Sequence, residues 1–158
     1  MPNRRTPNPP RSGALWGGRV IRKRAPAVPA AMMDRTLIDL LTQTDVPLSA
    51  YDLAAGLRGL GREVAVMSVY RALDRLCATD AVEKVATLSA YRVKDIPKAI
   101  LTICLSCGRT QPIPAPDLHD QLERVVLAAG FMPGSTAIET TGLCPQCRAR
   151  TPGSGMPD

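Results

Sequence analysis

The chain has 158 residues, of which 45% are hydrophobic and 22% charged, with a formal net charge of +6. This length allows one domain or two small ones and excludes a large multi-domain enzyme. No uncharged stretch approaches the roughly 20 apolar residues that cross a bilayer, and no apolar run of signal-peptide length follows the N-terminal arginines. We therefore expect a cytoplasmic protein without a membrane partner.

The positive charge lies mainly at the N-terminus. Seven of the 20 basic residues and none of the 14 acidic residues lie in residues 1–30, together with six prolines. Because such a composition cannot offset the entropy cost of ordering, we predict a disordered, basic, Pro-rich tail over 1–30 and a flexible tail over 151–158. The first tail is a solvated leader, an over-long gene start before Met32 or Met33, or a basic arm that lies along DNA phosphates.

Three helices are predicted next. Leu37, Leu40 and Leu41 form one apolar stripe of a helix that begins near Ala30. Ser49 followed by Asp52 is a capping box that begins a second helix, which ends at the glycines 59 and 61. A third helix begins near Ser68, and its predicted buried face holds Val69, Leu73 and Leu76.

Two short β-prone runs, 81–85 and 88–93, predict a hairpin behind the three helices. Three helices and a hairpin indicate a winged helix-turn-helix over residues 31–94, with its third helix in the DNA major groove and its hairpin on the DNA backbone. The basic residues of the body gather in 58–98, so any DNA-facing surface is expected there. From this pattern alone an ordinary charged helix surface is equally acceptable. The candidate DNA-binding residues are Ser68, Tyr70, Arg71, Arg75 and Arg58.

Four cysteines carry the strongest signal. They form two CxxC motifs separated by 36 residues, Cys104 with Cys107 and Cys144 with Cys147. Four thiolates at this spacing suit tetrahedral zinc, and a site with four protein ligands leaves no open position for catalysis. Disulfides are a poorer explanation in a cytoplasmic chain, and thiol redox chemistry normally uses one such motif at a helix start. We predict one structural zinc ion per chain.

Residues 95–150 read as a small α/β unit built around these motifs. Strands are expected over 99–104, 109–113 and 135–141, with a helix over 116–129 whose apolar stripe can cover the sheet. A short sheet of this kind leaves an edge free to pair with a second copy, so we expect a homodimer that binds a two-fold symmetric DNA site. The predicted fold class is α+β, a winged helix-turn-helix followed by a small α/β dimerisation domain with a four-cysteine zinc site.

In this order the motifs resemble the ferric uptake regulator (Fur) family, and its zinc-responsive (Zur) branch more than its iron branch. The resemblance covers about residues 32–150. It rests on the family-like segments Ser49-Ala50-Tyr51-Asp52-Leu53, Ser68-Val69-Tyr70-Arg71-Ala72-Leu73 and the two cysteine motifs, the second in Glu139-Thr140-Thr141-Gly142-Leu143-Cys144. The resemblance implies a dimeric, metal-linked transcriptional repressor, with Tyr70 and Arg71 at the DNA and structural zinc on the four cysteines.

The departures from that family concern its regulatory metal site. Members usually sense metal between the two domains with histidines and a carboxylate or cysteine, whereas this chain has one histidine, His119. The matching segments hold Val46-Pro47, Arg92-Val93-Lys94, Gln111-Pro112-Ile113 and Ser135-Thr136. The regulatory site is therefore predicted to be degenerate, since Arg92 and Lys94 would repel a divalent ion.

Two mechanisms remain open. In one, hinge cations pair with Asp95 or Glu83 and replace the metal, so that DNA binding needs no co-repressor. In the other, a different sensor uses Cys77 or His119, although Cys77 reads more readily as a small buried residue and His119 as a solvent-facing one. A function of another class, a mixed-dimer anti-repressor without its own operator, is disfavoured by the intact groove-facing residues. No phosphate-binding loop or catalytic set indicates an enzyme or a small-molecule substrate.

Overall fold

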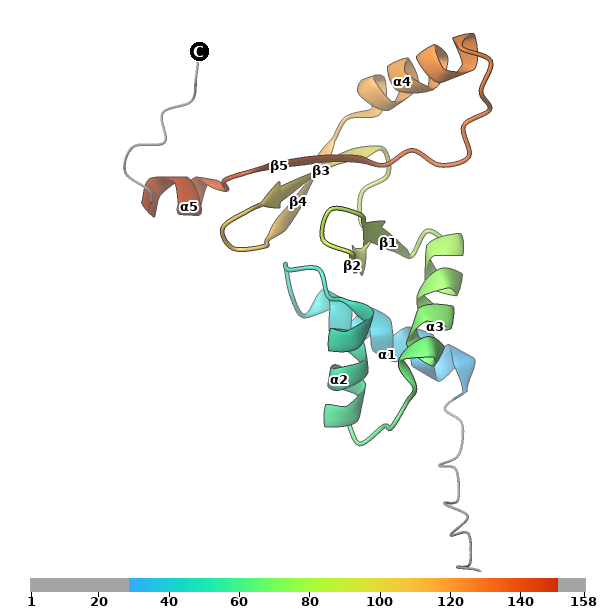
Figure 1. Cartoon of the computed structure of the whole chain (residues 1–158), viewed down its shortest axis with the longest axis vertical. Helices are drawn as coiled ribbons and strands as arrows, with labels where there is room; N and C mark the ends of the chain where they lie inside the picture. Colours follow the sequence, from blue (N-terminus) through green and yellow to red (C-terminus); the bar gives the residue numbers. More distant parts are fainter. Residues whose placement is uncertain (1–28, 151–158) are drawn as a thin grey trace, which may run out of the picture.

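The computed structural model describes residues 29–150, and all but the last two residues of the predicted N-terminal tail, together with the C-terminal tail, lie outside this range. Three helices and a two-stranded hairpin precede a three-stranded sheet with two further helices (Figure 1). No helix among the described residues is long and apolar enough to cross a membrane. In chain order the elements are α1 Ala30–Thr42, α2 Ala50–Gly59, α3 Val66–Ala78, β1 Val82–Val85, β2 Ala90–Val93, β3 Ala99–Cys104, β4 Thr110–Pro114, α4 Pro116–Ala128, β5 Ile138–Gly142 and α5 Pro145–Arg150.

The first three helices share one apolar core. Their fully buried side chains come from the stripes that the sequence predicts, since spacings of three and four residues place these positions on one helix face. These side chains include Leu37, Leu53, Leu57, Val69 and Leu73. The predicted helical arrangement of the N-terminal half is confirmed.

Two helix starts show how local chemistry sets the element boundaries. The capping box of α2 is present, because the Ser49 backbone N–H donates to Asp52 Oδ2 (2.9 Å) and the Asp52 N–H donates to Ser49 Oγ (3.2 Å). Helix α3 begins at Val66, two residues before the predicted start at Ser68. No side chain caps it, so the sequence carries no local signal for that boundary.

The hairpin turn lies against the second sheet. The Ala86 and Thr87 amides of this turn donate to Glu139 on β5, and the expected contact of the hairpin with the DNA backbone stays a prediction. The apolar side of the hairpin contributes Val85 to a small buried cluster with Leu101 and Ile103 of β3. The hairpin is thus shared between the helical unit and the sheet.

The second sheet has the order β4-β3-β5, antiparallel between β3 and β4 and parallel between β3 and β5. β3 has the predicted bounds, β4 lies one residue later than the predicted 109–113, and β5 runs over Ile138–Gly142 rather than 135–141. Helix α4 does not cover this sheet as its stripe suggested, since only His119 on it is buried, while the exposed residues include Leu118, Leu122 and Val125. Figure 1 shows α4 standing away from the strands, tied to the start of β3 by the Ala115 N–H that donates to the Lys98 carbonyl oxygen.

Candidate zinc centre and nucleic-acid interface

The four cysteines of the CxxC motifs meet at one end of the sheet. Cys104 is the last residue of β3, Cys107 lies in the turn to β4, and Cys144 and Cys147 frame the start of α5. Their sulfur atoms all lie within 4.8 Å of one another. Among residues 29–150 no other group of three or more histidines, cysteines and carboxylates brings its ligand atoms together in this way.

The geometry fits a tetrahedral zinc ion. Zinc–sulfur bonds of about 2.3 Å place the sulfurs of a tetrahedron about 3.8 Å apart, and the Cys107 and Cys144 sulfurs are 3.9 Å apart. Cys104 and Cys147 are buried, which shields the ligand set on one side. Four thiolates leave no open coordination position, so the cluster is of the type that holds structural zinc.

The cluster shifts the pKa values of two of its cysteines, Cys104 and Cys107, in opposite directions. The N–H groups of Cys144 and Cys107 lower the pKa of Cys104 to about 6. The backbone N–H of Arg109 lowers the pKa of Cys107, but contact with the thiols of Cys104, Cys147 and Cys144 outweighs it and raises that pKa to about 11. Without metal Cys104 is therefore a thiolate and Cys107 a thiol near neutral pH, whereas zinc binds both as thiolates and so releases the proton of Cys107.

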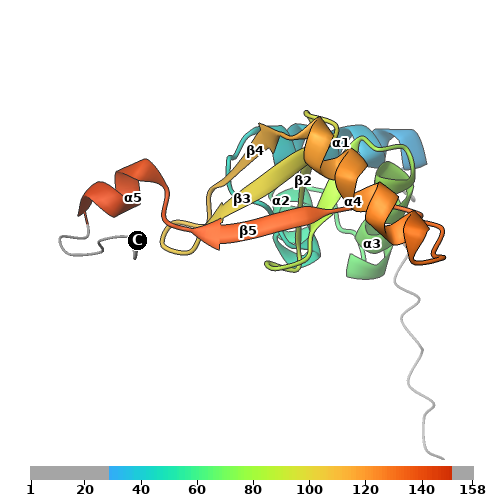
Figure 2. The ribbon, with the colours of Figure 1, turned by 90° about the horizontal axis from the view of Figure 1, so that it is seen from above.

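Two local structures shape the motifs. Gly108 has a positive φ of 71°, which L-residues with side chains rarely adopt, and its N–H donates to the Cys104 carbonyl oxygen at 2.9 Å. At the second motif the chain turns into α5, where the Arg150 guanidinium donates to Cys147 Sγ at 3.4 Å. Helix α5 is absent from the elements expected from the sequence, although proline is a common first residue of a helix and Pro145 directly follows Cys144. In both views α5 extends beyond the end of the sheet, on the side away from α3 (Figures 1 and 2).

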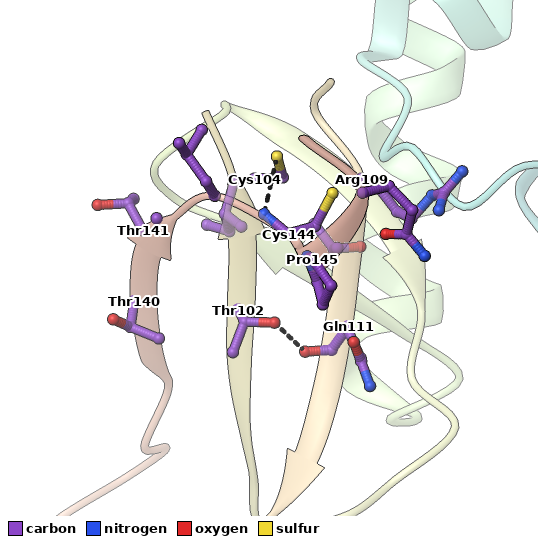
Figure 3. A pocket seen from close by; sticks show the side chains of 13 residues that line it. Thr102, Cys104, Arg109, Gln111, Thr140, Thr141, Cys144 and Pro145 are labelled. Carbon is purple, nitrogen blue, oxygen red and sulfur yellow. Dashed lines mark hydrogen bonds between the residues drawn. The ribbon is translucent and has the colours of Figure 1, made fainter. Parts of the chain in front are cut away.

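A cavity of about 360 Å³ adjoins the cysteine cluster (Figure 3). The Cys144 N–H donates to Cys104 Sγ (3.3 Å) beside it, and the Thr102 hydroxyl donates to the Gln111 carbonyl oxygen (2.9 Å) across β3 and β4. The one charged side chain in its lining is Arg109, whose Nε lies 3.7 Å from Asp45 of the α1–α2 loop. In the same loop the Asp45 carbonyl oxygen accepts a hydrogen bond from the Thr110 N–H at 3.1 Å. The cysteine end of the sheet thus touches the helical unit directly.

The candidate DNA-binding residues lie at different depths on α2 and α3. Arg71 and Arg58 are exposed, whereas Ser68 and Tyr70 are half-buried. Arg75 is already engaged, since its guanidinium forms an ion pair with Asp34 of α1 (2.6 Å) and donates to the Arg71 carbonyl oxygen (3.1 Å). Within residues 29–150 Arg58 and Arg71 form no ion pair, so their charges remain available to a phosphate or a base.

Ion pairs lie along the hairpin and the residues that flank it. Arg92 on β2 contacts Glu83 of β1 and also Asp95, with 2.9 Å to the second carboxylate. Lys94 pairs with Asp80 at 2.8 Å. The partners suggested by the sequence, Glu83 and Asp95, are therefore the ones that Arg92 contacts.

Cys77 and His119, the spare reactive residues, line one cleft of about 530 Å³ between the halves. His119 is buried and its Nε2 lies 3.1 Å from the Ala99 carbonyl oxygen, so the expectation of a solvent-facing histidine is wrong. The apolar stripe of α4 predicts that Leu118 and Leu122 are buried and His119 exposed. In the structure α4 turns the His119 side toward β3 and leaves the stripe exposed. Cys77 is half-buried, and burial raises the pKa of its thiol. Neither residue joins a ligand cluster within the described part of the chain.

A sequence model described as the ferric uptake regulator family matches residues 33–141. The chain belongs to the ferric uptake regulator family. This is a family of transcription regulators and not of enzymes, and the match confirms the resemblance seen in the motifs. The four-cysteine cluster has the composition and geometry of its structural zinc sites.

Two relatives of this Fur-family chain are named as zinc uptake regulation proteins. The zinc uptake regulation protein of Escherichia coli K12 is 31% identical over 116 residues, which cover 70% of this chain and 68% of that protein. The protein of the same name from Mycobacterium tuberculosis H37Rv is 29% identical over 119 residues, covering 73% and 92%.

Two solved structures show the same fold. A zinc uptake regulator in complex with zinc and DNA superposes with a TM-score of 0.69 at 29% identity, covering 75% of this chain and 82% of the other. The structure named holo XcZur gives 0.67 at 30% identity, covering 74% and 84%. The predicted likeness to the zinc-responsive branch is confirmed.

Proposed function

We propose that this Fur-family protein is a cytoplasmic, sequence-specific DNA-binding repressor. It acts as a homodimer on a two-fold symmetric operator, with one structural zinc ion per chain. The DNA complex of a related zinc uptake regulator supports the choice of double-stranded DNA as partner. The exposed guanidinium of Arg71 on α3 supports the choice of that helix for the major groove.

The regulatory metal site of this protein is degenerate, in our proposal, and ion pairs take its place. The observation that carries this part is Arg92, which lies between Glu83 and Asp95 and keeps only 14% of its side chain exposed. A guanidinium can bridge two carboxylates as a metal ion does, but it is permanently charged and bound covalently to the chain. The hairpin and the segment that leads from it to the sheet are then fixed relative to each other whatever the cellular metal level.

Metal content and DNA binding, measured together, test the proposal. Duplexes are selected from a random-sequence pool with the zinc-loaded chain, and gel shifts are then run before and after mild chelation and after addition of zinc, iron or manganese. We expect about one tightly held zinc per chain and an affinity that does not change between these conditions. A second metal per chain that switches DNA binding on would overturn the degenerate site, and failure to select any duplex would overturn DNA binding itself.

Substitution of Arg71 tests the role of α3. Arg71→Ala should weaken binding to the selected duplex by roughly 1–3 kcal/mol if the side chain contacts a base, with little change in stability because the side chain is exposed. Contact with a phosphate would mainly reduce the salt dependence of binding instead. Arg124→Ala removes the same charge from a different helix, α4, and serves as the control. If both substitutions weaken DNA binding equally, the prediction that α3 lies in the major groove is wrong.

The ion-pair replacement has a test of its own. Arg92→Ala leaves two carboxylates facing each other across the former guanidinium, so we expect DNA affinity to fall about tenfold, or 1.4 kcal/mol. Added zinc or manganese should recover part of this loss, because a divalent cation can bridge the same acids. An Arg92→Ala variant with unchanged affinity would show that the ion pairs do not hold the DNA-binding arrangement.

A further inference from the structure

The turn of the β1–β2 hairpin is held by one side chain from the other half of the molecule. Glu139 Oε1 accepts the Ala86 N–H at 2.6 Å, and Glu139 Oε2 accepts the Thr87 N–H at 2.9 Å. Each carboxylate oxygen thus takes one of two successive amides. Two parallel, charge-assisted bonds fix orientation as well as distance, which a single bond does not.

The position of Glu139 follows from the strand register. Glu139 pairs with Leu101 in the parallel ladder between β5 and β3, and paired residues of neighbouring strands point to the same sheet face. Leu101 on that face is buried with Val85 of the hairpin. The apolar contact and the carboxylate therefore act on the same side of the sheet, against the same hairpin.

The electrostatics of Glu139 favour its ionised form. Partial burial alone would raise the pKa of this carboxyl, but the hydrogen bonds from Thr87 and Ala86 outweigh burial and leave the pKa below its ordinary value. The group is therefore a carboxylate at neutral pH and accepts both bonds at full strength.

The hairpin in turn is joined firmly to the DNA-binding helices. Leu48 and Tyr91 exchange two backbone hydrogen bonds, at 3.0 and 2.9 Å, which connect β2 to the segment before α2. The Ala81 N–H donates to the Leu76 carbonyl oxygen at 3.0 Å, which fixes the exit of α3 relative to β1. A restraint on the hairpin turn is therefore a restraint on α3.

We infer that Glu139 is a positioning residue that locks the β1–β2 turn to β5 and so sets the orientation of α3 relative to the sheet. The inference rests on the proposed DNA-binding function, because the orientation of α3 decides how the two groove helices of a dimer are spaced. β5 is also an edge strand of its sheet, with one side left for a second copy. The lock thus joins the proposed dimer edge to the DNA-reading unit within each chain.

The test compares zinc-loaded, full-length Glu139→Ala and Glu139→Gln with the natural chain. In Glu139→Ala the amide protons of Ala86 and Thr87 should exchange with solvent about tenfold faster, and ¹⁵N relaxation should report independent tumbling of α3 and the sheet. The dissociation constant for the selected duplex should rise about fivefold to tenfold, because only a fraction of molecules keeps the competent orientation. Glu139→Gln retains one good acceptor oxygen and should fall between the other two chains.

Glu123→Gln is the matched control, since Glu123 is an exposed acid that lines the same cleft. It removes the same charge without touching the turn and should match the natural chain in exchange, relaxation and affinity. Unchanged exchange and relaxation in Glu139→Ala would overturn the lock, and faster exchange with unchanged relaxation and affinity would overturn its positioning role. If the natural chain selects no duplex, the proposed function fails, but the exchange and relaxation data still decide whether Glu139 holds the two halves together.

Discussion

At the scale of single residues, the capping box of α2 is the clearest link between sequence and stability. Ser49→Ala removes the acceptor of the Asp52 N–H, so we expect the free energy of unfolding to fall by about 1 kcal/mol, measured by denaturant titration of the zinc-loaded chain. Ser135→Ala, in the exposed loop before β5, should change it by less than about 0.5 kcal/mol. Equal losses would mean that the cap contributes nothing specific.

The same box gives a pH dependence with a definite sign. Hydrogen bonds from the Ser49 side chain and backbone lower the pKa of Asp52 from its ordinary 3.8. A lowered folded-state pKa means that the stabilisation is complete above 3.8 and is lost as the pH falls through the folded-state value. Carboxyl NMR titration should place Asp52 below 3.8 in the natural chain and closer to it in Ser49→Ala.

Arg75 illustrates what a sequence pattern cannot assign. Its position on the exposed side of α3 predicts a DNA contact, but its partner Asp34 lies 41 residues away on α1 and no local pattern reveals it. A double-mutant cycle with Arg75→Ala and Asp34→Asn should give a small favourable coupling in unfolding free energy, as for other exposed ion pairs. Strict additivity of the two losses would show that this ion pair does not tie α1 to α3.

At the scale of elements, the zinc motifs should carry the stability of the second sheet. Cys104→Ser or Cys144→Ser leaves three thiolates, and because structural zinc contributes on the order of 10 kcal/mol of apparent folding energy, β3 to α5 should lose their cooperative unfolding transition. Elemental analysis and thermal melting measure the effect. Cys77→Ser changes the one cysteine outside the cluster and should keep both zinc and melting temperature. A Cys104→Ser protein that melts like the natural chain would contradict a structural role.

Elements whose boundaries depend on local signals are predicted well, and those that depend on tertiary contacts are not. The stripe of Leu37 and Leu41, the Ser49 cap and the cysteine spacing all specify their own structure, so helices, strands and zinc ligands follow from the sequence. The sequence around Ala86 predicts a hairpin turn but not its contact with Glu139, because the two residues are 53 positions apart in the chain. The apolar stripe of α4 predicts that one face of the helix is buried, but it does not say whether that face packs on the sheet of the same chain or on another surface.

At the scale of the whole molecule, that uncovered stripe bears on assembly. By helical spacing Val125 lies on the stripe with Leu118 and Leu122, and its side chain is 61% exposed within one chain. If the stripe contributes to the proposed homodimer, Val125→Asp should convert dimer to monomer in sedimentation velocity, because a buried unpaired carboxylate is costly. Leu127→Asp, on the opposite face and 50% exposed, should leave the dimer intact. Dimers that survive Val125→Asp would place the interface elsewhere.

The meeting of the two CxxC motifs at the end of a parallel ladder has a consequence for how the chain folds. Strands β3 and β5 become neighbours only after the long crossover through β4 and α4 has closed, and such non-local pairing is slow because loop entropy is lost before contacts form. Cys104 ends β3 opposite Gly142, two residues before Cys144, so a metal ion held by the first motif captures the second at the correct register. In that order of events β5 would pair from this anchored end toward Ile138, and Glu139 would be among its last residues to reach the hairpin. Zinc supply during synthesis would thus set the rate at which the nascent protein becomes competent, even though the function proposed for the mature protein does not require it to sense zinc.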